Sequence, residues 1–269
     1  MSKNKKSRNA EDPGLDLGSA TATLEPEEGA EIECDAPDVG EVNFVNTPEP
    51  APAPKADGLP PILIEVVAPS LNRPKEAARL EQALAACAIP EGYELKINVQ
   101  RETQPRALPV IVNELVAQSE ASIVVVLADH IVPKPGLIEA VIRAFEGRPD
   151  IGMVGLNIVN MPPAPGVREY CFFALCRPFI NHFPERQVLC PDYHHFYGDT
   201  ELGNFANGAE AFHFATDAEI ETHHVNNGLA DQDDTWRASR SRKKQDAETY
   251  ELRQRKGLVW GKSFERVNP

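Results

Sequence analysis

The chain of 269 residues has no apolar run of 18 residues, so a membrane-spanning helix is excluded. It has five cysteines, an odd number, and no Cys-x-x-Cys pair, so neither a disulfide framework nor a thiolate zinc site is indicated. The basic residues among the first eight are followed by no apolar segment, so no secretory signal is expected. These absences together predict a cytoplasmic location with reduced, mostly buried cysteines.

The first 58 residues also have few large apolar side chains, and none of them recur with a helical or strand period. Through Asp57 this segment holds 5 Lys or Arg against 13 Asp or Glu, and residues 48–54 alternate proline with alanine or glutamate. Such a segment buries too little apolar surface to offset the entropy of ordering. We therefore predict a disordered acidic, Pro-rich tail over residues 1–58 and one folded domain over residues 59–269.

Charge is unevenly distributed in the folded part, although the whole chain has a net charge of −14. Residues 59–236 contain 12 basic and 24 acidic side chains, whereas residues 237–269 contain 10 basic and 4 acidic ones. A basic segment of this kind can contact the phosphates of a nucleotide, a nucleic acid or a membrane surface. It can equally be the solvated face of a helix.

Strand and helix patterns alternate along residues 59–160. Apolar strand-like runs occur at 61–68, 93–99, 123–127 and 153–159, and residues with helical spacing separate them at 74–87, 108–116 and 137–145. This alternation predicts an α/β fold with a mostly parallel, Rossmann-like sheet and flanking helices. Right-handed crossovers would bring the loops 69–74 and 128–135 to one pocket.

The stretch from Ser122 to Gly136 carries the first chemical signal. Its five apolar residues show no alternation, which is typical of a strand buried on both faces in the middle of a parallel sheet. Asp129 and His130 follow the strand directly, where open α/β sheets bind ligands. The alternative is that Asp129 only caps a turn.

VAPSLNRP, followed by NELVAQSEASIVVVLADHIVPKPGLIEAVIRAFEGRPDIGMVG, resembles the nucleotide-sugar half of GT-A-fold glycosyltransferases of the family 2-like group. The resemblance spans about residues 62–236 and implies a GT-A-like domain with a nucleotide-sugar half (59–160), an acceptor half (161–236) and a basic helical end (237–269). It implies that Pro69, Ser70 and Arg73 lie beneath the nucleobase, and that Asp129 holds a divalent cation on the diphosphate.

The resemblance departs from the family pattern at the cation. His130 replaces an acid, and an imidazole ligand favours Mn²⁺ over Mg²⁺ or marks a metal-independent member. In this family a histidine late in the chain often completes the coordination of the cation. Adjacent strand residues face opposite sides, so at most one of His223 and His224 can face the site, and we predict His223. A packed, hydrogen-bonded histidine is the alternative. No clear counterpart of the family's base-contacting acid is found among Asn98, Gln100 and Glu102, which leaves the base open.

The segment GDTEL, residues 198–202, resembles the family's acidic motif at the start of the acceptor-side helix. The resemblance implies that Asp199 is the general base of an inverting transfer, with Glu201 as the second candidate. An N-cap role for Asp199 is the alternative.

The predicted function is the transfer of a hexose from a UDP- or GDP-linked donor to a hydroxyl acceptor, assisted by Mn²⁺ or Mg²⁺. The acceptor is a glycan or a modified nucleobase in DNA, and the basic C-terminal segment leaves a polyanionic acceptor open. A nucleotidyltransferase is less consistent with the sequence, because PSLNRP contains no glycine to form a phosphate loop. A non-catalytic GT-A-like binding protein is the contrasting alternative. The sequence does not indicate an oligomeric state.

Overall fold

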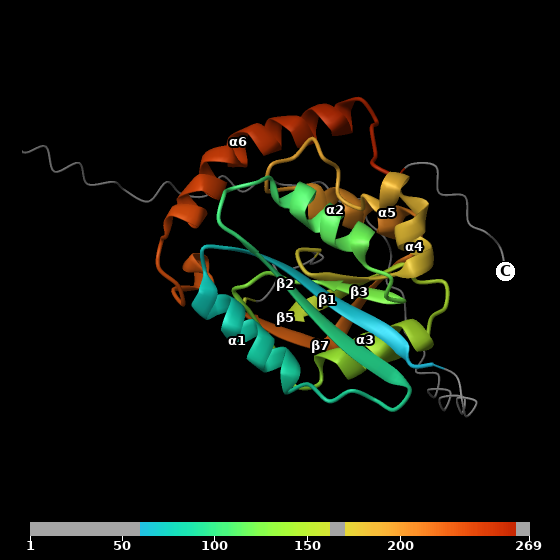
Figure 1. Ribbon diagram of the computed structural model, residues 1–269. Coiled ribbons are helices and arrows are strands. Elements are labelled where there is room, and N and C mark those ends of the chain that lie inside the picture. The colour runs from blue at the N-terminus through green and yellow to red at the C-terminus, as the bar shows by residue number, and fades with distance from the viewer. Residues whose placement is uncertain (1–59, 162–169, 262–269) are drawn as a thin grey trace, which may run out of the picture. The chain divides into compact units, whose positions relative to one another are not determined.

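Short runs of Val, Ile and Leu form a seven-stranded sheet in the computed structural model, which describes residues 60–161 and 170–261 (Figure 1). The strands are β1 (Ile62–Leu71), β2 (Tyr93–Glu102), β3 (Ile123–Val126), β4 (Ile131–Pro133), β5 (Met153–Ile158), β6 (Phe173–Cys176) and β7 (Phe212–Thr222). The α-helices are α1 (Pro74–Ala85), α2 (Leu108–Gln118), α3 (Leu137–Glu146), α4 (Arg177–His182), α5 (Gly198–Gly208) and α6 (Asp234–Arg255), and two 3₁₀ turns are η1 (Pro184–Arg186) and η2 (Val225–Asn227). The predicted tail, residues 1–58, lies outside the described residues, so the division into tail and domain stays a prediction.

The strand order is β2-β1-β3-β6-β5-β7-β4. β1, β2, β3, β5 and β7 run in one direction, and only β4 and β6 run against them. The predicted mostly parallel α/β architecture is therefore confirmed. β2 lies at one edge, as its alternating apolar and polar residues indicate.

β3 lies inside the sheet, between β1 and β6, and all four of its residues are buried. It pairs with β1 in parallel, in the register Val67 to Val126, so the ends of these two strands meet at one edge of the sheet as predicted. Its other neighbour, β6, is antiparallel, which corrects the prediction of parallel neighbours on both sides. β6 has only four residues, without a periodic pattern, and the pairing with β3 and β5 forms it as a strand.

The helices cover both faces of the sheet. α1 and α3 pack their apolar residues, such as Leu80 and Ile138, on one face, while α2, α4 and α5 pack residues such as Val112 and Phe179 on the other (Figure 1). Both layers exclude water from the sheet, which is why the strands read as continuous apolar runs. The polar chemistry of the fold is consequently left to the strand ends and loops.

α6 is a 22-residue, mostly polar helix that lies across the same side of the sheet as α2 (Figure 1). It begins after Asp233, whose side chain accepts a hydrogen bond from the backbone N–H of Trp236 at 2.7 Å and so caps the helix. The basic segment that begins at residue 237 thus contains a helix, which starts three residues earlier, at Asp234. Among residues 60–161 and 170–261, no helix combines the length and apolarity that crossing a bilayer needs.

Candidate functional site

The loops that follow β1 and β3 face one cavity of about 300 Å³, as the topology predicts. Six of the residues expected at the site line it: Pro69, Ser70, Arg73, Asp129, His130 and Asp199. They come from three segments that are far apart in the sequence. The cavity opens at the carboxyl ends of β1 and β3, which is where open α/β sheets bind ligands.

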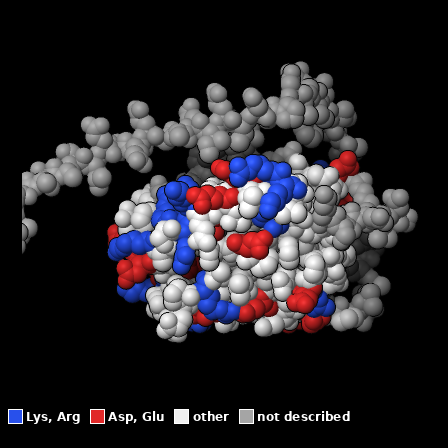
Figure 2. Space-filling model, turned by 90° about the horizontal axis from the view of Figure 1, so that it is seen from above, with Lys and Arg blue, Asp and Glu red and all other residues white. Residues whose placement is uncertain are grey.

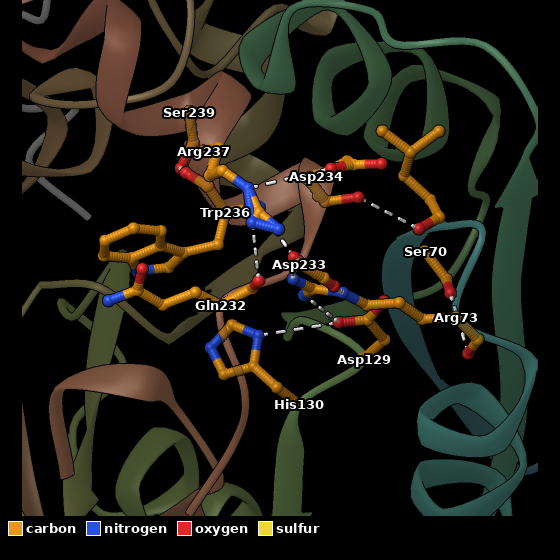
Figure 3. Close-up of polar contacts among 12 residues, drawn as sticks. Ser70, Arg73, Asp129, His130, Gln232, Asp233, Asp234, Trp236, Arg237 and Ser239 are labelled. Carbon is orange, nitrogen blue, oxygen red and sulfur yellow. Dashed lines mark hydrogen bonds and ion pairs between the residues drawn. The ribbon is translucent and has the colours of Figure 1, made fainter. Parts of the chain in front are cut away.

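Asp129 is a buried carboxylate that contacts a cation already present in the fold. Its side chain is 5% exposed, and its Oδ1 lies 3.4 Å from a terminal nitrogen of Arg73. Arg73 also donates two hydrogen bonds to Asp233, from Nε at 2.6 Å and from its other terminal nitrogen at 2.7 Å (Figure 3). The guanidinium therefore stands between two carboxylates, one after β3 and one at the start of α6.

Arg73 and the carboxylates beside it stabilise one another's charged forms. Burial by itself would lower the pKa of Arg73, but Asp233 and Asp129 raise it overall, so the guanidinium stays protonated. The hydrogen bonds from Arg73 in turn hold the pKa of Asp233 below its ordinary value. At neutral pH the guanidinium of Arg73 is thus protonated and the carboxylate of Asp233 ionised.

The imidazole of His130 lies beside Asp129, with 3.5 Å between Nδ1 and Oδ1 (Figure 3). The ring of His224 is 5.4 Å from the ring of His130 between centroids, and it lines the same cavity. Burial, reinforced by His130 and nearby arginines, lowers the pKa of His224 to about 4, so its imidazole is neutral at neutral pH.

The choice of His223 over His224 is not supported by the geometry. Nδ1 of His223 lies 3.1 Å from a terminal nitrogen of Arg79, and its Nε2 is 4.0 Å from Glu221. β7 ends at Thr222, so the two histidines follow the strand, and His223 lines a second cavity of about 310 Å³ that Arg73, His130 and His224 also line. His224, unlike His223, lines the main cavity together with Asp129 as well.

A closed metal cage is not preformed. Within the described part of the chain, no group of three His, Cys, Asp or Glu side chains is arranged so as to hold a metal ion. Asp129, His130 and His224 nevertheless converge on the cavity, with one carboxylate and two imidazoles between them. This donor set suits Mn²⁺ chemically, and Arg73 is the group with which an ion would compete for Asp129.

Asp199 lies at the second position of α5 and lines the cavity. The N-cap position of the helix is Tyr197, which has a left-handed conformation with φ of 70°, so the N-cap alternative for Asp199 is wrong. One carboxylate oxygen of Asp199 accepts a hydrogen bond from the backbone N–H of Thr200 at 2.8 Å. Asp199 is thus a partly exposed carboxylate held at the cavity wall.

Glu201, the second candidate base, has a structural role instead. Its side chain is 1% exposed and accepts hydrogen bonds from Tyr193 at 2.6 Å, from Arg253 at 2.9 and 2.8 Å, and from the backbone N–H of Trp260 at 2.7 Å. Burial would raise the pKa of Glu201, but these donors, led by Arg253, lower it overall. A fully engaged carboxylate that is closed to the cavity cannot take a proton from a substrate.

Several cavity residues were not predicted from the sequence. Glu102 ends β2 beside the end of β1, in register with Leu71, and accepts a hydrogen bond from Arg106 at 3.0 Å. Phe172 and Phe196 supply aromatic walls. Asp233 pairs with Arg73 across 160 residues, and no local pattern in the sequence marks such a partner.

Comparisons with known proteins bear on the fold. No protein-family model matches the chain, and no curated sequence matches it either. Solved structures do match it. A mannosyltransferase from Pyrobaculum calidifontis, in complex with GDP-Man and Mn²⁺, is 13% identical with a TM-score of 0.50, and the match covers 72% of this chain and 65% of the mannosyltransferase.

Two others are more distant. TarS from S. aureus is 14% identical with a TM-score of 0.42, over 58% of this chain and 59% of TarS. A mutant β-1,4-galactosyltransferase 7 from Drosophila, in complex with manganese, UDP-Gal and xylobiose, is 10% identical with a TM-score of 0.45, over 66% of this chain and 79% of that one. This chain thus spans 65% and 59% of the lengths of the mannosyltransferase and TarS. On the likeness to the mannosyltransferase and its own sheet topology, the chain has the fold of GT-A glycosyltransferases.

Proposed function

We propose that the protein is a glycosyltransferase that transfers a hexose from a UDP- or GDP-linked donor to a hydroxyl acceptor, assisted by Mn²⁺ or Mg²⁺, in the cytoplasm. The observation that carries the proposal is the convergence of six expected residues, from three separate segments, on one cavity at the ends of β1 and β3. The fold supports it, because a mannosyltransferase of the same fold is solved with GDP-Man and Mn²⁺.

The nucleoside of the donor belongs at the end of the cavity formed by β1, β2 and α2. Pro69 and Ser70 supply its floor, and Glu102 is the acid that accepts hydrogen bonds from the ribose or base. Arg73 lies between this end and Asp129, so its guanidinium is placed to bind the diphosphate. The choice between uracil and guanine depends on contacts that Glu102 and its neighbours make with the base.

A divalent ion would be held by Asp129 and His130, with His224 in place of the predicted His223. When bound, such an ion stabilises the negative charge that develops on the departing diphosphate. The residues fit it by donor type, since a buried carboxylate and a neutral imidazole are the protonation states that bind metals. Arg73 supplies a second, permanent positive charge for the same diphosphate.

Asp199 is the proposed general base. It takes the proton of the acceptor hydroxyl while the hydroxyl oxygen forms a bond to the anomeric carbon. The bond from that carbon to the diphosphate breaks, and the nucleoside diphosphate leaves with the electron pair. Attack from the face opposite the leaving group inverts the anomeric configuration, and Asp199, on α5, approaches the cavity from the acceptor half.

The basic half of α6 supports a polyanionic acceptor. We define the basic face of α6 as Arg237, Arg240, Arg242, Lys243 and Lys244, a stretch without acidic residues. Figure 2, which views the molecule from the side on which α6 lies, shows Lys and Arg side chains gathered there next to acidic ones. Thr235, two residues before Arg237, lines the same cavity as Asp199, so the basic residues begin beside that cavity.

One observation favours a second candidate, a non-catalytic nucleotide-binding protein. Arg73 already neutralises Asp129, and the described residues contain no preformed three-ligand metal group. Such a protein would bind a nucleotide through Arg73 without needing a metal. The two candidates therefore differ in the metal dependence of nucleotide binding.

Thermal unfolding with a matrix of Mn²⁺, UDP and GDP distinguishes them. The glycosyltransferase is expected to be stabilised by one nucleotide only when Mn²⁺ is present, by about 2.7 kcal/mol at a hundredfold excess over Kd. Asp129→Asn removes this stabilisation, while Asp150→Asn, at an exposed site beyond α3, retains it. Incubation with UDP- and GDP-linked sugars then identifies the donor by its hydrolysis. Equal stabilisation with and without Mn²⁺, and no donor hydrolysis, would favour the non-catalytic protein.

A further inference from the structure

Only two residues of α6 are buried, and both are charged: Asp246, which is 0% exposed, and Arg253, which is 8% exposed. The two oxygens of Asp246 accept hydrogen bonds from three successive backbone N–H groups, those of His194 at 2.9 Å, His195 at 2.8 Å and Phe196 at 2.9 Å. We call residues 194–196 the acceptor loop. One buried carboxylate of α6 thus fixes three consecutive residues of a loop about 50 positions earlier.

Each side of this contact needs the other. A buried carboxylate is costly unless hydrogen bonds replace its water, and three charge-assisted bonds do so here. Residues 194–196 belong to no helix or strand, so their backbone N–H groups have no partners within secondary structure. The hydrogen bonds to Asp246 supply these partners where α6 covers the loop. The curled backbone that directs three N–H groups at one anion is the kind of concavity that binds anions in many proteins.

The acceptor loop leads directly to the proposed base. His195 and Phe196 line the main cavity, and Asp199 lines it three residues later. Between them Tyr197 adopts the left-handed conformation that starts α5. The direction in which Asp199 enters the cavity therefore depends on where residues 194–196 lie. Asp246 itself does not line the cavity.

Two further residues of the same α6 face contact the flanks of this loop. The ring of Tyr250 stacks on Tyr197, with 5.0 Å between centroids and 19° between planes. Arg253 bonds Asp192 at 2.6 Å, on the other flank. Residues 246, 250 and 253 share one face because they are four and three positions apart in the helix. The five basic residues precede these positions in the helix, and four of the five, all except Arg240, are exposed.

We propose that Asp246 is a positioning residue for the transfer reaction: it holds the acceptor loop so that Asp199 faces the anomeric carbon of the donor. The inference rests on the proposed function. It assigns no contact with the donor to Asp246, since the residues proposed to hold the nucleoside and the metal lie on other elements.

The test compares Asp246→Asn with Glu248→Gln, which removes a charge from an exposed position of the same helix. Asparagine keeps the size of the side chain but offers one acceptor oxygen in place of two. Hydrogen exchange is expected to accelerate at least tenfold at the amides of residues 194–196 in Asp246→Asn, and to stay unchanged in Glu248→Gln. The kcat of donor turnover is expected to fall about 10- to 100-fold, as for a displaced catalytic group, with the Kd of the nucleotide unchanged.

A second variant guards against misfolding of the first. Tyr250→Leu removes the ring that stacks on Tyr197 without leaving a buried charge unpaired, and the same separation of kcat from Kd is expected, to a smaller extent. Unchanged exchange at residues 194–196 in Asp246→Asn, or an unchanged kcat, would overturn the proposal, as would a parallel loss of nucleotide binding in both variants. If the unmodified protein neither binds nor turns over nucleotide sugars, the proposed function fails and the catalytic role of Asp246 fails with it, while amide exchange still shows whether Asp246 holds the loop.

Discussion

Asp199 and Glu201 are two positions apart, yet α5 directs them to different surroundings. Successive helical residues are about 100° apart, so residues two apart point to nearly opposite sides. Asp199 lines the cavity, and Glu201 is closed off beneath Arg253, Tyr193 and Trp260. The sequence shows that an acidic motif begins the helix, but the packing decides which acid is free to react.

Asp199→Asn is expected to lower the kcat of transfer by about 10²- to 10⁴-fold, the usual contribution of a general base, while the Kd of the nucleotide stays the same. The reason is that Asp199 lies on the acceptor side and the donor-binding residues lie elsewhere. Steady-state kinetics together with calorimetric titration of the nucleotide measure both quantities. Asp150→Asn is the control, and an unchanged kcat in Asp199→Asn would contradict the assignment.

Glu201→Gln is expected to destabilise the fold by about 3–5 kcal/mol, because it leaves the buried guanidinium of Arg253 with only the largely exposed carboxylate of Asp192 as an anion. The loss should depend on pH. The pKa of Glu201 is lowered from 4.5 in the folded protein, so its stabilisation is fully present above pH 4.5 and is lost as pH falls through the folded-state pKa. The difference in free energy of unfolding between the two proteins should therefore narrow below pH 4.5. Urea denaturation across that range measures it, and a gap independent of pH would contradict the assignment.

The two adjacent histidines provide a matched pair of variants. His224→Ala is expected to weaken Mn²⁺-dependent nucleotide binding at least tenfold, because its ring lies beside His130 in the main cavity. His223→Ala is expected to leave it within twofold, since that ring contacts Arg79. Nucleotide titrations with and without Mn²⁺ decide between them. Equal losses in both variants would show that the pair acts through the backbone of the segment rather than through one ring.

At the scale of elements, the strand–helix alternation predicted most of the nucleotide-sugar half. β1, β2, β3 and β5 and the helices between them occur where the apolar runs and the helical spacing place them. β4 and β6 have three and four residues and no pattern of their own. Their strand character comes from pairing with β7 and β3, which is long-range information.

The same limit applies to the site. Pro69, Ser70 and Arg73 could be assigned because the carboxyl end of a strand and the loop after it have a fixed place in this type of sheet; Pro69 and Ser70 lie within β1 itself, and Arg73 follows it. The pairing of Arg73 with Asp233, and the hydrogen bonds from the acceptor loop to Asp246, join segments that are distant in the sequence. Nothing local distinguishes Asp233 or Asp246 from other acids of a polar helix.

The basic face of α6 gives a prediction at this scale. Replacing its five residues with glutamine is expected to abolish salt-sensitive binding to a polyanion such as duplex DNA, because each phosphate contact adds about 0.9 to the slope of log K against log salt. Fluorescence anisotropy at several salt concentrations measures the slope, and Arg148→Gln, at an exposed site after α3, is the control. Unchanged binding after all five replacements would show that the basic face does not bind the polyanion and is only a solvated surface of the helix.

At the scale of the whole molecule, the chain combines an acidic N-terminal segment with a folded part that has its own core. The buried residues on the two faces of the sheet form this core within residues 60–161 and 170–261. The boundary at residue 58 stays a prediction, and it is open to a direct test.

Removal of residues 1–58 is expected to leave the Tm within about 2 °C of that of the full chain, since a shift of about 1 kcal/mol already moves the Tm of a domain of this size by 2–4 °C. Calorimetry on both proteins measures the difference. A markedly lower Tm for the shortened chain would show that the acidic segment contributes to the fold.

α6 has one more consequence. As an unbroken helix of 22 residues it is about 33 Å long, with Asp233 holding Arg73 at its start and Asp246 holding residues 194–196 farther along. Because the helix is continuous between these two contacts, a tilt that moves one of them also moves the other. If the proposed function holds, we therefore expect a diphosphate that displaces the guanidinium of Arg73 to change the position of residues 194–196 as well, because one helix makes both contacts.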